Sequence, residues 1–296
     1  MARVLAELGE RREALEVLGK AVREFPESAS LWILYAEELM QGQEWAALGR
    51  VAFQLREARG VRQFLQAYSL YLEARAEHGL HRYGAATRAL EKMLEWEFQP
   101  ENRVLEAASR LLDLGYERIA RGLLAKMPSA LHGEAAYWKL LFHVAEKLKD
   151  EELMVEASRR AYQLQAGDPI NRNNYAAALL IRRQNPEEAV TLTFGLWAEN
   201  PRHPTARINH AAALLLNRRV DEGATLLESV EPNRLTASEA LLYDLDLFEA
   251  YCGLGQFERA RGAGARVDAG RLYPTQRQWF ERTLAELTRT DSRLGY

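Results

Sequence analysis

The chain has 296 residues, is 48% hydrophobic and carries a formal net charge of −3. This composition suits a large buried core, and the slight negative charge argues against a general nucleic-acid binder, which normally presents a strongly basic face. No apolar run reaches the roughly 18 residues that a membrane-spanning helix needs, so we expect no membrane insertion. The amphipathic N-terminus contains acidic residues and lacks a signal-peptide pattern, which favours a cytoplasmic location.

Apolar residues recur at three- and four-residue steps nearly everywhere, and no segment alternates as a strand does. In the first part of the chain the pattern predicts helices at 1–8, 10–24 and 30–41, a turn at Gly42 followed by a helix to about 59, and helices at 61–78, 82–96, 101–114 and 116–127. In the second part it predicts helices at 134–148, 151–165, 171–183, 186–199, 204–217, 221–229, 238–254, 257–267 and 275–287. The sequence therefore predicts an all-α fold.

A small residue recurs at intervals of roughly 32 to 38 residues, which is typical of stacked units of two helices each. The recurring residues are Ala14, Ala47, Ala85 or Ala86, Ala120, Ala157, Ala189, Gly223 or Ala224, and Ala260. Glycine precedes some of them by five residues, at Gly9, Gly42, Gly115 and Gly255. Because glycine readily adopts the left-handed conformation that closes a helix, we expect a helix to end at each of these glycines.

The pattern predicts a single solenoid over residues 1–287, with an incomplete first repeat and an irregular register at 50–135. The helix after residue 275 would cap the array, and residues 288–296 would form a frayed tail. The segment Gly262-Ala263-Gly264-Ala265 places two glycines in a helix, each costing about 1 kcal/mol relative to alanine. We expect close approach by the terminal helix to offset that cost.

Several second helices resemble a known repeat. Ala14, Leu18, Ala21 and Pro26 share their spacing with Ala189, Thr193, Leu196 and Pro201, and Tyr251 precedes Gly255-Gln256-Phe257-Glu258-Arg259-Ala260. This pattern resembles the tetratricopeptide repeat over nearly the whole chain. The resemblance implies a right-handed superhelical solenoid of about seven to eight antiparallel helix pairs. It also implies a concave groove, lined by the first helix of each pair, that binds extended peptides or partner helices.

Two similar segments are the sharpest candidates for a binding site. Asn174-Tyr175-Ala176-Ala177-Ala178-Leu179-Leu180 is followed by Asn209-His210-Ala211-Ala212-Ala213-Leu214-Leu215. Both asparagines should fall at equivalent points of successive first helices. An amide that donates and accepts can pair with the backbone of a bound peptide. The alternative is that both asparagines fix the packing of neighbouring helices.

The same register predicts further groove residues, for which an ordinary solvated face is the alternative. They are Tyr71, Arg75, Lys139, His143, Arg182, Asn217, Asp246 and Glu249. The six histidines do not converge with the single cysteine into a metal site, and the chain carries no phosphate-binding or dinucleotide-binding loop. We therefore expect no metal, no cofactor and no enzymatic activity.

Together these features predict a non-catalytic scaffold that binds a protein or peptide partner in its groove. Two alternatives remain open from the sequence. The chain could be the substrate-recruiting repeat region of a larger enzyme or of a secretion or assembly machine. It could also associate with itself through an exposed N-terminal repeat, because array ends without a polar cap tend to stick together.

Overall fold

The computed structural model describes residues 5, 9–58, 60–127 and 132–294, and every regular element in these ranges is helical. The helix expected at 1–8 lies largely outside the described residues. Contacts divide the chain into two compact units, Met1–Leu131 (unit 1) and His132–Tyr296 (unit 2). The all-α fold is confirmed, and the single solenoid over 1–287 stays a prediction.

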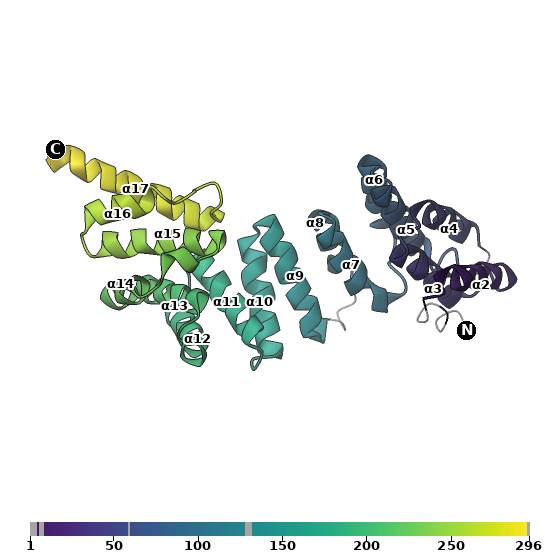
Figure 1. The fold of residues 1–296 in the computed structure, drawn as a ribbon, viewed down its shortest axis with the longest axis horizontal. Helices are drawn as coiled ribbons and strands as arrows, with labels where there is room; N and C mark the ends of the chain where they lie inside the picture. Colours follow the sequence, from purple (N-terminus) through teal and green to yellow (C-terminus); the bar gives the residue numbers. More distant parts are fainter. Residues whose placement is uncertain (1–4, 6–8, 59, 128–131, 295–296) are drawn as a thin grey trace. The chain divides into compact units, whose positions relative to one another are not determined.

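Unit 1 consists of helices, most of which pack on the helix that follows in the chain (Figure 1). They are α2 (Arg11–Glu24), α3 (Ala29–Gln41), α4 (Trp45–Glu57), α5 (Gln66–Gly79), α6 (Tyr83–Met93), α7 (Val104–Asp113) and α8 (Glu117–Ala125). The 3-10 helix η1 (Glu101–Arg103) leads directly into α7. The pairs are α3–α4, α5–α6 and α7–α8, so α3, α5 and α7 are the first helices of this unit.

Unit 2 continues the same pattern of helix pairs. Its helices are α9 (Ala135–Leu148), α10 (Glu151–Leu164), α11 (Pro169–Arg182), α12 (Pro186–Glu199), α13 (Pro204–Leu216), α14 (Val220–Glu228), α15 (Ala237–Gly253), α16 (Phe257–Gly264) and α17 (Pro274–Leu294). Three successive first helices also contact one another: α11 packs on α13, and α13 packs on α15. We call the surface built by first helices the first-helix face.

Most of the recurring small residues are buried where two helices approach closely, as packing of antiparallel helices requires. Ala14, Ala86, Ala120, Ala157, Ala189, Ala224 and Ala260 are all at most 5% exposed. Ala47 is an exception, because it is only half-buried and its neighbour Leu48 is fully buried. The register expected at α4 was therefore wrong by one residue.

The turn before α4 explains this shift. Gly9, Gly115 and Gly255 have φ of 84°, 82° and 71°, as expected for glycine at a helix end, but Gly42 has φ of −78° and Gln43 takes the left-handed conformation with φ of 57°. The following helix consequently starts one residue later. Elsewhere the left-handed residue of the turn carries a side chain, at His81, Lys149, Arg183 and Arg218.

The C-terminal helix α17 packs beside α15 and α16 (Figure 1). Phe280 of α17 and Phe248 of α15 stack edge to face at 5.0 Å. A Cβ on Gly264 would lie 3.0 Å from Phe248 of α15, so the close approach that favours glycine there comes from α15; Phe280 of the terminal helix would be in ordinary contact at 3.7 Å. No atom lies within 4 Å of the corresponding position on Gly262, so the expectation was wrong for that residue. The helix continues to Leu294, past the boundary expected at residue 287.

Candidate functional site

The first-helix face of unit 1 holds a cavity of about 500 Å³. Its walls come from α3, the turn into α4, α5, η1 and α7: Glu37, Met40, Gln41, Gln43, Trp45, Tyr71, Arg75, His78, Gly79, Arg103, Glu106, Arg110 and Leu114. Two of the predicted groove residues, Tyr71 and Arg75, therefore lie together in one cavity. Its remaining walls mix charged and apolar side chains.

Arg75 is held by Tyr71 one turn earlier on α5. An Arg75 Nη1 donates a hydrogen bond of 3.1 Å to the Tyr71 hydroxyl, and the guanidinium lies 5.9 Å from the ring centroid. Burial raises the pKa of Tyr71, and Arg75 opposes that rise. Among the described residues no carboxylate lies within ion-pair distance of Arg75. The cavity therefore presents a positioned cation whose charge is not neutralised locally.

The carboxylates of this cavity are bound by a different arginine. Arg103 lies 2.5 Å from Glu37 Oε1 and donates from Nη1 to Glu106 Oε2 at 2.9 Å. Arg110 is more weakly paired, because its Nη1 lies 3.9 Å from Oδ2 of its nearest acidic partner, Asp113. The cavity thus contains three arginines and two glutamates, and Arg75 and Arg110 provide the excess positive charge.

In unit 2, Asn174 and Asn209 occupy equivalent points of α11 and α13, which begin at Pro169 and Pro204. Their environments differ. Asn209 is 8% exposed and donates from Nδ2 to Asn173 Oδ1 at 3.3 Å. Asn174 is half-buried. A peptide-binding role for these asparagines stays a prediction, and the Asn209–Asn173 bond favours a packing role for one of them.

Three other predicted residues lie outside both cavities of the first-helix faces, the one in unit 1 and a smaller one in unit 2. Lys139 Nζ donates to Asp168 Oδ2 at 2.7 Å and lowers the pKa of this carboxyl, which caps the start of α11. His143 is exposed and lies 3.5 Å from Glu146. Asn217 is half-buried in the turn after α13. Lys139 and His143 thus already contact acidic groups of the chain.

The second first-helix cavity, of about 320 Å³, lies in unit 2 between the first helices and the segment before α17. It is lined by Glu146, Ala177, Leu180, Ile181, Asn209, Ser238, Leu241, Leu242, Asp246, Arg271, Leu272, Tyr273 and Gln276. Asp246 is 7% exposed, and burial, aided by Glu249, raises its pKa well above the usual value. Its carboxyl has no hydrogen-bond or ion-pair partner among the described residues.

The remaining predicted residues surround this segment. Glu249 accepts two hydrogen bonds from Arg183, at 2.8 and 2.5 Å. Arg182 lies 3.4 Å from Glu151, 3.2 Å from Glu152 and 3.5 Å from the Thr275 hydroxyl. The structure therefore brings Arg182, Asp246 and Glu249 near the C-terminal segment, an arrangement that the sequence did not indicate.

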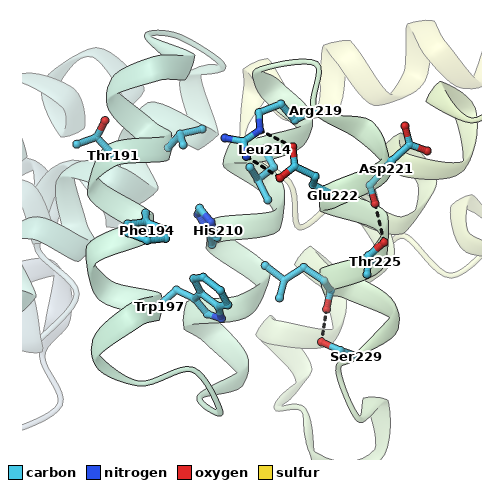
Figure 2. A pocket seen from close by; sticks show the side chains of 12 residues that line it. Thr191, Phe194, Trp197, His210, Leu214, Arg219, Asp221, Glu222, Thr225 and Ser229 are labelled. Carbon is cyan, nitrogen blue, oxygen red and sulfur yellow. Dashed lines mark hydrogen bonds and ion pairs between the residues drawn. The ribbon is translucent and has the colours of Figure 1, made fainter.

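A third and larger cavity, of about 820 Å³, lies among α12, α13 and α14 (Figure 2). Phe194 and Trp197 of α12 face His210 of α13, and the indole stacks on the imidazole at 5.2 Å (Figure 2). The Thr193 hydroxyl donates to the Ala189 carbonyl at 2.7 Å, so its oxygen accepts from His210 Nδ1 at 3.0 Å. Burial and then Arg219 lower the pKa of His210, which keeps the ring neutral.

The family model of the tetratricopeptide repeat matches residues 1–38. Helix pairs of the same kind follow these residues through both units. No curated protein matches the sequence of the chain.

Solved structures similar to this chain share little sequence with it. The APC/C hetero-tetramer Cut9–Hcn1 matches at 13% identity and a TM-score of 0.39, over 93% of this chain and 52% of that one, so the chain spans about half its length. The TPR2AB domain of yeast Sti1 in its pHSP90 complex matches at 16% identity and 0.31, over 88% and 95%. The TPR domain of P58(IPK) matches at 14% and 0.31, over 98% and 97%.

The sequence analysis missed two features of the structure. The cavity beside α12 involves Phe194 and Trp197, whose three-residue spacing puts both on one helix face, and this was the available signal. The covering of the unit 2 face by residues near 272 gave no local signal. In the described part of the chain, no group of three or more His, Cys, Asp or Glu could hold a metal ion, and no helix is long and apolar enough to span a membrane.

Proposed function

We propose that the protein is a non-catalytic interaction scaffold and that the first-helix face of unit 1 binds an extended partner segment carrying an acidic side chain. One observation carries this proposal: Arg75 is positioned by Tyr71 in an open cavity without a carboxylate partner among the described residues. A carboxylate from a partner would complete this arrangement through a charge-assisted hydrogen bond.

The surroundings of Arg75 support an extended segment as the ligand. The cavity crosses α3, α5 and α7, so a bound chain would contact successive repeats. Trp45 and Met40 supply apolar contact area beside the arginines. Glu37 and Glu106 are bound to Arg103 and so do not neutralise Arg75 directly. The partner would be a protein or peptide, with its acidic residue directed at Arg75 and Arg110.

The experiment selects peptides by phage display on the full-length protein and measures their affinity by fluorescence polarisation. Arg75→Gln should weaken acidic peptides about tenfold or more, because a hydrogen bond between charged groups contributes about 1.5–3 kcal/mol. Arg62→Gln is the matched control, since Arg62 is exposed and outside the cavity. Equal affinities for the Arg75→Gln variant and the wild type would contradict the proposal.

A further inference from the structure

Three polar side chains that are more than nine-tenths buried line the 320 Å³ cavity of unit 2. Asp246 of α15 is 7% exposed, Asn209 of α13 is 8% exposed and Gln276 of α17 is 7% exposed. Much of the remaining wall is aliphatic and is built by Leu180, Ile181, Leu241, Leu242 and Leu272. Buried polar groups normally find hydrogen-bond partners within the protein, so their grouping around a cavity points to a ligand.

Each of these three side chains keeps hydrogen-bonding capacity that the described part of the chain does not use. Asn209 Nδ2 donates to Asn173 Oδ1 at 3.3 Å, and Gln276 Oε1 accepts from the backbone N–H of Tyr273 at 3.4 Å. The Asn209 carbonyl, the Gln276 amide nitrogen and the Asp246 carboxyl have no partner among the described residues. An acid, an amide oxygen and an amide nitrogen are therefore available to a molecule in the cavity.

Asp246 is the group of the cavity that gains most from a ligand. Burial and then Glu249 raise its pKa, and Arg183, which binds Glu249, opposes that rise. An ionised carboxyl without a partner is costly away from water. Arg271, a basic residue of the wall, is exposed and forms no ion pair with Asp246 among the described residues. A cation inside the cavity would let Asp246 ionise and would form a charge-assisted hydrogen bond with it.

The size and covering of the cavity suit a small molecule. Residues 269–275, which we call the covering segment, lead into α17 and form part of the wall. Lys149 Nζ donates to the Leu272 carbonyl at 3.2 Å, and Glu151 Oε1 accepts from the backbone N–H of Thr275 at 2.8 Å, so the segment is held at both ends. Small-molecule sites measure about 300–1,000 Å³, and this cavity lies at the lower end of that range. A compact ligand therefore fits better than a polypeptide that crosses the repeats.

We propose that this cavity binds a small primary amine with an apolar body. The ammonium group donates to the Asp246 carboxylate and to Asn209 Oδ1, and the hydrocarbon body contacts the leucines of the wall. When the amine binds as a cation, the proton of the Asp246 carboxyl passes to solvent. The inference does not rest on the proposed function, because it concerns another unit, other residues and a ligand that is not a polypeptide.

The test uses phenethylamine and its neutral counterpart 2-phenylethanol, titrated into the full-length protein at pH 7 in a calorimeter. The amine should bind the wild type at least about tenfold more tightly than the alcohol, because hydrogen bonds between charged groups are stronger than neutral ones. Asp246→Asn should weaken the amine at least about tenfold and leave the alcohol nearly unchanged, because an amide carries no charge. Asp244→Asn is the matched control, since Asp244 lies on the same helix and binds Arg266 outside the cavity.

Further arms of the experiment separate the cavity from other sources of binding. Ala177→Leu narrows the cavity from α11 but keeps Asp246, and it should weaken the amine and the alcohol alike. Arg75→Gln should leave amine binding unchanged, so failure here and failure of the unit 1 proposal are distinguishable.

A lysine side chain carries the same ammonium group as the proposed ligand. Nα-acetyl-lysine methylamide, which attaches that group to a peptide backbone, should bind more weakly than phenethylamine, because the covered cavity has little room for a backbone. Tighter binding of the lysine derivative would overturn the proposal of a free amine. The proposal also fails if the wild type, folded by circular dichroism, binds the amine no better than the alcohol, or if Asp246→Asn binds the amine as the wild type does.

Discussion

The two units build similar helix pairs but leave their first-helix faces in different states. In unit 1 the face is open and Arg75 lacks a carboxylate partner among the described residues. In unit 2 the face is covered by the chain itself, and Lys139, Arg182 and Arg183 are bound to Asp168, Glu151 and Glu249. These three cationic side chains of unit 2 are thus paired with carboxylates of the unit's own helices, whereas Arg75 of unit 1 has no such partner.

The largest expected effect concerns the packing of α17, the helix that follows the covering segment and holds it in place. Phe248 of α15 is fully buried and contacts Trp279 and Phe280 of α17. Phe248→Ala should destabilise unit 2 by about 3–5 kcal/mol, because a large buried ring is lost and a cavity remains. Urea denaturation measures the loss, and hydrogen exchange locates it. If Phe248→Ala accelerated hydrogen exchange equally in both units, Phe248 would not stabilise unit 2 selectively, and the contrast between the units would be contradicted.

Phe53 offers a matched control in unit 1 because it is 62% exposed. Phe53→Ala should change stability by no more than about 0.5 kcal/mol, as is usual for surface substitutions.

The next effect concerns the carboxylate that binds the covering segment. Glu151 is 5% exposed and accepts from the Thr275 backbone and hydroxyl and from Arg182. Glu151→Gln should cost about 1.5–3 kcal/mol, which is typical of hydrogen bonds to a charged group. Glu152→Gln, at a site 82% exposed, should be nearly neutral. Urea denaturation of both variants tests this, and equal losses would mean that the cover contributes nothing specific.

A smaller effect is expected at Arg183, which joins Glu249 to Trp279. Arg183→Lys keeps the charge but loses the paired hydrogen bonds and the planar stack, at a cost of about 1 kcal/mol. Arg218→Lys is the control, since Arg218 has φ of 62° and is exposed in the turn after α13. Thermal denaturation should separate the two variants, and an equal shift for both would contradict the role given to Arg183.

The smallest effect has the opposite sign. The raised pKa of Asp246 means that the folded protein favours its protonated form. The stabilisation that protonated Asp246 contributes is fully present below the pKa of the unfolded state, about 3.9, and is lost as pH rises through the pKa of the folded state. At neutral pH, Asp246→Asn should therefore stabilise the protein on the order of 0.5–1 kcal/mol.

The pH dependence supplies the check for Asp246. Urea denaturation from pH 4 to 8 should show the advantage of Asp246→Asn over the wild type growing with pH. An advantage that stays constant, or a loss at neutral pH, would show that a group near Asp246 compensates its charge.

The sequence predicted local features well because they depend on local chemistry. Pro186 starts α12, and Gly115 and Gly255 close helices, since these residues have few other conformations that suit a helix end. The turn at Gly42 was misassigned because Gln43 can also adopt the left-handed conformation. Lys149 and Leu272 are more than a hundred residues apart in the sequence, so no local periodic pattern predicts their contact. The open and covered faces therefore became distinguishable only in the structure.

Hydrogen exchange at the backbone amide of Thr275 in the full-length protein tests the central contrast most directly. This amide donates to Glu151, so we predict slow exchange in the wild type, at least about tenfold faster exchange in Glu151→Gln, and unchanged exchange in Glu152→Gln. Exchange of the Thr275 amide in the wild type at the rate of a free peptide would contradict the account, because the face of unit 2 would then be as open as that of unit 1.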